Sequence, residues 1–356
     1  MKSAHRLLFA LLLLLLALFE FPFITAAETP LTALEPAPEG TFSIAVLPDT
    51  QQYRGRGTKS QPDSTDPVTN TTFDTYAQWI ADNIETQRIV FVTHVGDIVD
   101  KNVPEQWEVA RQCMDRLRGR VPYGICPGNH DMTAGGDTSL FQKYFPQSGF
   151  EGFPWYGGAF TSPDESQAVS GNNANSYQLF SAEGLDFVIL HLECNAPDDV
   201  LVWANAVLEE HADRRAIVTT HMYLGPAERP QTSEDYYAAP KGRMRWTKVH
   251  GERGNSAEAM WEECFSLHKN LFMVICGDQS RTQAMLQTAV GRHGNIVHAV
   301  LSDYGVNGFR VYRFVPKENI IYVQTVNPIT GVFCEGTSFV PDPRQHQFIL
   351  SYGMGE

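Results

Sequence analysis

The stretch VPYGICPGNHD at residues 121–131 decides the fold. Its first part, 121–126, has the length and apolar composition of a buried strand, and the tetrapeptide Gly-Asn-His-Asp follows at 128–131. The amide oxygen of Asn129 suits a metal ligand, and the imidazole of His130 suits a group that handles charge on a leaving oxygen. We therefore predict that this strand ends at a metal-dependent site.

Four more apolar runs end in polar residues of the same kind. Asp49 follows residues 42–47, Asp97 follows 89–95, His221 follows 216–220, and Asp278 follows 271–276. In an open α/β sheet, loops at the carboxyl ends of the strands converge on one edge, where ligands bind. The sequence therefore predicts that these side chains gather at one edge of a sheet.

Strand-like and helix-like segments alternate along the chain, which predicts βαβ units and a largely parallel sheet. The first half contains expected strands at 42–47, 89–95, 121–126, 177–180 and 185–192, with helices at 73–86, 105–117 and 198–211. The second half contains expected strands at 215–220, 271–276, 296–301, 308–315 and 319–326, with a helix at 256–268. Glu183 and Gly184 form a predicted hairpin turn, and residues 131–175 and 222–254 are expected to be loops near the site.

The N-terminus has the pattern of a secretory signal. Lys2 and Arg6 precede the apolar run 7–19, and small residues at 25–27 suit a cleavage site. The alternative is an uncleaved membrane anchor, but the run ends well short of the roughly 20 residues that a spanning helix needs. We expect a signal peptide at 1–27, a leader at 28–40, a single domain at 41–328, and a tail at 329–356 of unassigned structure.

Composition bounds the location and partners of the mature chain. A cleaved signal predicts a secreted or periplasmic protein, and no later segment is apolar enough to span a membrane. The formal charge of -14 disfavours nucleic acid as a large partner. The six cysteines form no compact disulfide framework, and Cys126 and Cys276 end predicted strands, where buried free thiols are expected. His94, His191 and His298 lie within predicted strands and are expected to be core residues.

The strand-end residues are typical of a site for divalent cations. Asp49 and Asp97 offer carboxylate oxygens and His221 offers an imidazole nitrogen, while Gln51 and Asp278 can add further oxygens. This mixture fits Mn, Fe, Zn or Mg better than a thiolate site does. Two adjacent ions could clamp a phosphoryl group and make hydroxide available near neutral pH. The alternative for each aspartate is a turn cap, and for Gln51 a hydrogen bond to a ligand.

With these residues in place, the chain resembles the calcineurin-like metallophosphoesterases, and in particular an exported branch whose first motif is Asp-Thr-Gln. The resemblance runs from about residue 42 to 328 and rests on four ordered motifs: Asp49-Thr50-Gln51, Gly96-Asp97-Ile98-Val99-Asp100, Gly128-Asn129-His130-Asp131 and Thr220-His221. It implies an α/β fold that is a four-layer α/β/β/α sandwich of two mixed sheets, with two divalent metal ions at the strand ends.

The resemblance also implies a role for each matching position. Asp97 would bridge both metal ions, Asp49 would bind the first, and Asn129 and His221 would bind the second. His130 would assist the leaving oxygen, and Asp100 would orient its ring, since a carboxylate that accepts a ring N–H fixes the tautomer. The implied activity is hydrolysis of phosphate mono- or diesters by a metal-bound hydroxide.

Two departures from the family pattern affect the first metal. Gln51 stands where most relatives have a histidine, and the closing Gly-His-x-His motif is replaced by Gly277-Asp278-Gln279-Ser280. Asp278 can replace one histidine with a carboxylate, but Ser280 is a poor substitute for the other. The second hypothesis is therefore a catalytically impaired relative that acts as a ligand-binding module.

Overall fold

The computed structural model describes residues 34–226, 228, 230–243 and 248–353. The expected signal peptide at 1–27 and the first part of the expected leader lie outside these residues. In the described part of the chain, no helix combines the length and apolarity that crossing a bilayer requires.

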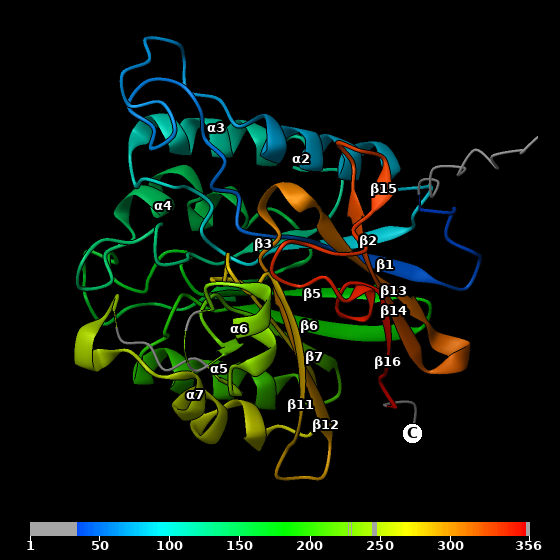
Figure 1. Cartoon of the computed structure of the whole chain (residues 1–356). Helices are drawn as coiled ribbons and strands as arrows, with labels where there is room; N and C mark the ends of the chain where they lie inside the picture. Colours follow the sequence, from blue (N-terminus) through cyan, green and yellow to red (C-terminus); the bar gives the residue numbers. More distant parts are fainter. Residues whose placement is uncertain (1–33, 227, 229, 244–247, 354–356) are drawn as a thin grey trace, which may run out of the picture. The chain divides into compact units, whose positions relative to one another are not determined.

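The first sheet has the strand order β15-β14-β13-β1-β2-β3, with β16 beside β14 (Figure 1). Its strands are β1 (Phe42–Leu47), β2 (Ile89–His94), β3 (Tyr123–Ile125), β13 (Phe309–Val315), β14 (Ile320–Asn327), β15 (Val332–Phe333) and β16 (Phe348–Ser351). The pairs β1–β2 and β2–β3 are parallel, whereas β1–β13 is antiparallel. Helices α2 (Thr71–Asn83) and α3 (Pro104–Asp115) make the two crossovers between the parallel strands.

The second sheet has the order β11-β12-β10-β7-β6-β5-β4. Its strands are β4 (Tyr156–Ala159), β5 (Ser176–Ala182), β6 (Leu185–His191), β7 (Arg215–Thr219), β10 (Leu271–Cys276), β11 (Ala284–Val290) and β12 (Ile296–Ser302). The four strands β6, β7, β10 and β12 are parallel neighbours, and the outer pairs are antiparallel. The other elements are α4 (Ser139–Tyr144), α5 (Asp198–Glu210), β8 (Leu224–Pro226), α6 (Ser233–Ala238), β9 (Lys241–Arg243) and α7 (Ala257–Glu263).

Three apolar layers hold four layers of structure together. In β1, Ala45 and Leu47 pack with α2 and α3, whereas Ile44 and Val46 point to the opposite face and pack against the second sheet. The far face of the second sheet packs against α5 and α7. In Figure 1, α2 and α3 cover one side and α5 and α7 the other. The fold is the predicted four-layer α/β/β/α sandwich of two mixed sheets.

Local sequence explains where the elements begin and turn. Asn70 caps α2, because its side-chain oxygen accepts a hydrogen bond from the amide of Phe73 at 3.0 Å. Between β5 and β6, Glu183 and Gly184 have φ angles of 50° and 79°, as the two central residues of a type I′ hairpin turn require. The predicted hairpin is confirmed.

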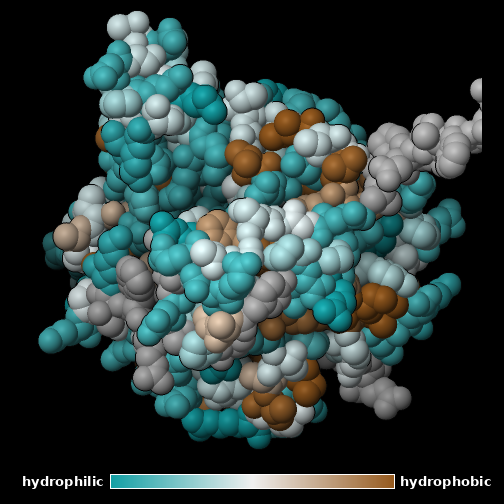
Figure 2. Space-filling view, viewed as in Figure 1, coloured by the Kyte–Doolittle hydropathy of each residue, from teal (hydrophilic) through white to brown (hydrophobic). Residues whose placement is uncertain are grey.

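Residues expected to be loops, or left without an assigned role in the sequence, complete both sheets. The expected loop 131–175 contains α4 and β4, and β4 pairs with β5, while the expected loop 222–254 contains β8, α6 and β9. β11 pairs antiparallel with β12, although residues 284–290 carried no clear strand signal. The tail contributes β15 and β16, which both pair with β14. Figure 2 shows a largely hydrophilic face with separate apolar patches, one of them over the turn between β11 and β12. Single exposed apolar residues of this kind are normal on a domain surface.

Cys126, Cys276 and the strand histidines are core residues, as expected, and the other four cysteines are buried as well. All six cysteines lie in the described residues, and each is a buried free thiol. His94 and His191 are fully buried. The Nε2 atom of His191 lies 2.8 Å from the hydroxyl of Thr93, and its Nδ1 atom lies 2.7 Å from Oε1 of Gln178. Burial lowers the pKa of each of these two histidines to about 3.

These two histidines predict a loss of stability in acid. The unfolded chain binds a proton at each near pH 6.5, whereas the native protein does not bind one until about pH 3. The free energy of unfolding is therefore expected to fall below pH 6.5 by about 1.4 kcal/mol per pH unit for each histidine. Urea unfolding between pH 7.5 and 5.5 measures how steeply the free energy of unfolding depends on pH. The variant His191→Gln is expected to lose the contribution of one histidine to this slope. The exposed His293→Gln is the control, and an unchanged slope in His191→Gln would contradict the argument.

Candidate metal centre

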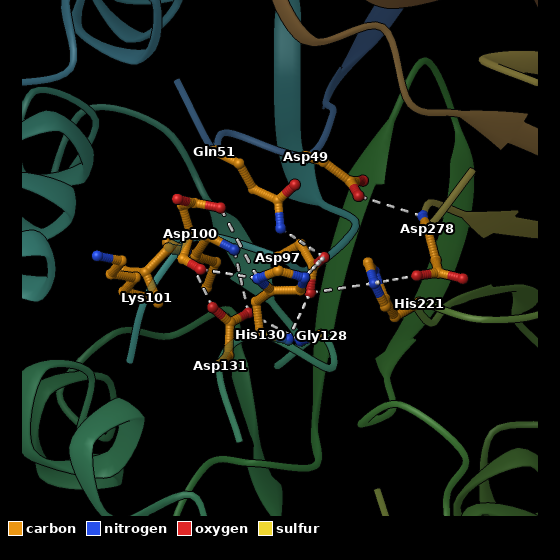
Figure 3. A network of polar contacts seen from close by, with 12 residues as sticks. Asp49, Gln51, Asp97, Asp100, Lys101, Gly128, His130, Asp131, His221 and Asp278 are labelled. Atoms are coloured by element: carbon orange, nitrogen blue, oxygen red, sulfur yellow. Dashed lines mark hydrogen bonds and ion pairs between the residues drawn. The ribbon is translucent and has the colours of Figure 1, made fainter. Parts of the chain in front are cut away.

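The predicted site residues follow the C-terminal ends of parallel strands from both sheets. β1 leads to Asp49 and Gln51, β2 to Asp97 and Asp100, β3 to Asn129 and His130, β7 to His221, and β10 to Asp278. Figure 3 shows Asp97 in the middle of this group, between His130 and His221. The site therefore lies where the edges of the two sheets meet.

Three of the predicted ligands form a compact buried group. Asp49, Asp97 and His221 each offer a ligand atom, and these atoms lie within 4.8 Å of one another. The Nε2 atom of His221 is 3.2 Å from Oδ1 of Asp97 and 3.7 Å from Oδ1 of Asp278. Its Nδ1 atom is 2.8 Å from the carbonyl oxygen of Val95, which accepts the Nδ1 proton. The Nε2 atom of His221 therefore faces the carboxylates, and its lone pair is available to a cation when the ring is neutral.

Buried polar atoms in this group fit a divalent cation. Oδ1 of Asp49 and Oδ1 of Asn129 are buried, and neither has a hydrogen-bond partner among the described residues. Such atoms are uncommon because an unpaired buried oxygen costs free energy, and a place for an ion is one recognised explanation. Two carboxylates, an amide oxygen and an imidazole nitrogen make a donor set that Mn, Fe, Zn and Mg accept.

The carboxylates of the group lie close enough to affect one another's pKa values. Burial raises the pKa of Asp49 well above its usual value, and the carboxylate of Asp303 raises it further. Burial disfavours the imidazolium form of His221, but the carboxylates of Asp97 and Asp49 outweigh it and raise the pKa of His221. Two carboxylates and one imidazole form this buried group, further carboxylates adjoin it, and a bound cation would relieve the repulsion between them.

Asp131 is a residue of the site whose role the sequence did not reveal. Its carboxylate accepts hydrogen bonds from the amides of Gly128 at 2.8 Å, Ile98 at 3.1 Å and Val99 at 3.0 Å. Burial, and then the charge of Asp97, raise the pKa of Asp131 to about 7. Asp131 joins the loop after β3 to the loop after β2, and so positions the ligands that both loops carry.

Gly128 allows the loop after β3 to approach Asp97 closely. A Cβ atom at Gly128 would lie 2.2 Å from the backbone nitrogen of Asp97 and 2.3 Å from its Oδ1 atom. Asp97 itself has a φ of 49°, which a non-glycine residue adopts only where surrounding contacts hold it. The close contact leaves no room for any side chain other than hydrogen.

Gly128→Ala is therefore expected to displace the carboxylate of Asp97 and to weaken metal binding by about 10-fold or more, because a shift of about 1 Å at a site can cost on the order of 100-fold. Isothermal titration of the metal-free protein with Mn²⁺ measures the change. The matched control is Gly152→Ala, since a Cβ atom there meets nothing within 4 Å. Equal Mn²⁺ affinity in the two variants would show that the loop yields without moving Asp97.

His130 is held by backbone atoms. Its Nδ1 atom is 2.8 Å from the carbonyl oxygen of Asp100, and its amide donates to Oδ1 of Asp97 at 2.8 Å. The Asp100 carboxylate is 3.9 Å from the same Nδ1 atom and accepts a hydrogen bond from Lys59. The carboxyl–imidazole hydrogen bond expected from the sequence is thus replaced by a carbonyl–imidazole one. The Nε2 atom of His130 lies 3.9 Å from Oδ2 of Asp97, on the side of the metal ligands.

Gln51 and Asp278 lie beside the compact group. The amide nitrogen of Gln51 donates to Oδ2 of Asp97 at 2.7 Å, which is the hydrogen-bonding alternative to ligation. The backbone amide of Asp278 donates to Oδ2 of Asp49 at 3.2 Å. Five of the six residues predicted as ligands are therefore in contact at this edge, and Asn129 follows Gly128 in the loop that approaches Asp97.

A family model described as calcineurin-like phosphoesterase matches residues 42–253, which is more than half of the chain. The chain belongs to the calcineurin-like phosphoesterase family. The matched residues include every strand end from Asp49 to His221, whereas Asp278 lies beyond them.

Individual proteins similar to this chain share less than a third of their aligned residues with it. The chain is 29% identical over 269 residues to the uncharacterized protein YvnB of Bacillus subtilis strain 168, and the match covers 72% of this chain but only 18% of YvnB. Two solved structures are similar in fold. The 5′-nucleotidase precursor of Thermus thermophilus is 11% identical with a TM-score of 0.44, and the match covers 82% of this chain and 52% of that chain. The NAD nucleotidase of Haemophilus influenzae is 12% identical with a TM-score of 0.41, and the match covers 78% of this chain and 48% of that chain.

One further acidic residue at this edge of the calcineurin-like domain was missed. Asp303 directly follows β12 and is 4% exposed, and its Oδ2 atom has no hydrogen-bond partner in the described part of the chain. Burial, and then the charge of Asp278, raise the pKa of Asp303 to about 7. The signal was present in the sequence, because an apolar run at 296–301 precedes Asp303 in the way that apolar runs precede the other site residues.

Proposed function

We propose that this calcineurin-like domain hydrolyses phosphate mono- or diesters with the help of two divalent metal ions. The observation that carries the proposal is the buried group of Asp49, Asp97 and His221, with the imidazole of His130 beside it. The family supports metal-dependent phosphoester chemistry, and the donor set supports the cation.

Each residue of the group supports a distinct task. Asp97 lies between the other ligands and would bridge the two ions, Asp49 would hold the first, and Asn129 and His221 would hold the second. When bound, the ions supply positive charge for the phosphoryl oxygens and lower the pKa of water. Gln51 holds Oδ2 of Asp97 in place, and Asp278 adds a carboxylate beside His221.

His130 is suited to assist the leaving oxygen of the ester. The carbonyl of Asp100 takes up Nδ1, so Nε2 is left to face the site. In the imidazolium form, Nε2–H can donate its proton to the departing alkoxide. His130 can exchange this proton with solvent, because its side chain is 29% exposed.

The test compares hydrolysis with and without metal. Protein treated with a chelator and then reloaded with Mn²⁺ is expected to hydrolyse members of a panel of aryl and alkyl phosphate mono- and diesters, whereas the metal-free protein is expected to be inactive. Elemental analysis of the purified protein accompanies the assay. Protein that takes up Mn²⁺ but hydrolyses no ester in the panel would contradict the proposed activity.

The second candidate function is a phosphoester-binding module without efficient catalysis. Gln51 and Ser280 support it, because neither an amide nor a hydroxyl equals the histidine that most relatives have. Binding of a phosphate ester with no turnover, in protein that holds metal, would favour this function over hydrolysis.

We further propose export, from the signal pattern at residues 1–27. N-terminal sequencing of protein recovered outside the cytoplasm is expected to begin near Glu28. Protein that retains Met1 or stays in the cytoplasm would contradict export with cleavage.

A further inference from the structure

Asp303 occupies the position next to Asp278 at the edge of the second sheet. β10 and β12 are parallel neighbours, and their last paired residues are Cys276 and Leu301. Asp278 and Asp303 each come two residues after this pair. Asp278 and Asp303 therefore occupy equivalent positions after two neighbouring strands, at the edge of the sheet where the predicted ligands lie.

One oxygen of Asp303 is bound and the other is left without a protein partner. The amide of Gln279 donates a hydrogen bond to the Asp303 carboxylate, and the amide of Asp303 donates to the carbonyl of Gln283 at 2.9 Å. These contacts fix the backbone and one side of the carboxylate. Oδ2 is buried and has no hydrogen-bond partner among the described residues. An unpaired buried oxygen calls for an explanation, and a bound cation is a recognised one.

Asp278 connects Asp303 to the group that contains Asp49. The backbone amide of Asp278 donates to Oδ2 of Asp49 at 3.2 Å, and Asp303 follows the strand that neighbours the strand of Asp278. Asp49 also has an oxygen, Oδ1, without a hydrogen-bond partner in the described part of the chain. Asp49 and Asp303 are thus two neighbouring buried carboxylates, and each has an unpaired oxygen.

We propose that Asp303 is a ligand of the divalent cation at Asp49, where it supplies the donor that Ser280 does not. This inference rests on the metal centre of the proposed function. Asp49, Asp97 and Asp303 then give the first site oxygen donors alone, and Gln51 adjoins it. Oxygen donors suit a hard cation, so the structure assigns Mn²⁺ or Mg²⁺ to this site. The second site keeps the nitrogen of His221.

Calorimetric titration of the metal-free protein with Mn²⁺ tests the assignment without reference to activity. The wild type is expected to bind two equivalents, whereas Asp303→Asn is expected to bind one with unchanged affinity and the other about 100-fold more weakly or not at all. Asp303→Glu keeps a carboxylate, so its weaker site is expected to bind Mn²⁺ more tightly than the weaker site of Asp303→Asn. The control is Asp115→Asn, which alters an exposed carboxylate of α3 outside the group and is expected to leave both equivalents unchanged.

Thermal unfolding shows whether the variant is folded. Asp303→Asn removes one of four mutually repelling carboxylates, so the metal-free variant is expected to melt no lower than the metal-free wild type. Its gain in melting temperature on addition of Mn²⁺ is expected to be smaller. An Asp303→Asn variant that binds two Mn²⁺ ions with wild-type affinity, or that melts lower and keeps the full Mn²⁺-dependent gain, would overturn the proposal. A wild type that binds no metal would overturn the proposed function as well, so the two failures are distinguishable.

Discussion

Asp97→Asn is expected to remove both metal equivalents and to lower kcat/KM for any phosphoester substrate by at least about 1,000-fold, since the ions contribute several kcal/mol to catalysis. Asp97 contacts three site residues: Nε2 of His221 at 3.2 Å, the amide of His130 at 2.8 Å and the side chain of Gln51 at 2.7 Å. An asparagine has the same shape but loses the negative charge and one acceptor oxygen. Its amide group would also face a donor, either Gln51 or His130.

Elemental analysis and steady-state kinetics measure the two losses together. The control is Asp115→Asn, because Asp115 is an exposed residue of α3 that pairs with Arg111 on the same helix. Surface changes of this kind usually alter stability by no more than about 0.5 kcal/mol. An Asp97→Asn variant that retains two ions per chain would show that Asp97 is not the bridging ligand.

His130→Ala is expected to lower kcat by about 100- to 10,000-fold, the usual contribution of a general acid, while metal content stays at two equivalents. The backbone amide of His130 still donates to Asp97 in the alanine variant, so the ligand geometry is retained. Nδ1 lies on the carbonyl of Asp100, and Nε2 is assigned to the leaving oxygen, so the ring is not expected to bind metal.

The leaving group provides a sharper test of this role. An alkyl phosphate needs a proton on its departing oxygen, whereas a nitrophenyl phosphate leaves readily without one. The kcat of His130→Ala is therefore expected to fall much further for the alkyl ester. An equal fall for both esters would assign His130 to substrate binding, and an unchanged kcat would exclude it from the reaction. The exposed His293→Ala is the control.

The sequence predicted the fold well where the apolar period was clear. The run 42–47 became β1 with Ala45 and Leu47 on one face and Ile44 and Val46 on the other, because both faces of this strand are buried. Residues 284–290 were missed because β11 is an edge strand that buries few of its side chains. The tail was missed because β15 and β16 are only two and four residues long, and long-range pairing with β14 holds them.

The site was predicted through residue type and strand-end position, and three residues show what such a pattern misses. Asp100 was expected to act through its carboxylate, but its carbonyl makes the contact, and side-chain identity cannot reveal a backbone bond. Asp131 acts by accepting three amide hydrogens from two loops, an arrangement that exists only after both strands pair. Asp303 belonged to the same pattern but lay outside the familiar motifs.

The proposed metal ligands come from two sheets, and in the described residues each strand of these sheets pairs only within its own sheet. Asp49 and Asp97 extend from the first sheet, and His221 and Asp278 from the second. A cation bound among them would therefore cross-link the two sheets of the sandwich. Ile217 lies in the apolar layer between the two sheets. Because close-packed interiors transmit small displacements, Ile217→Val is expected to change the spacing of the sheets and with it the metal affinity.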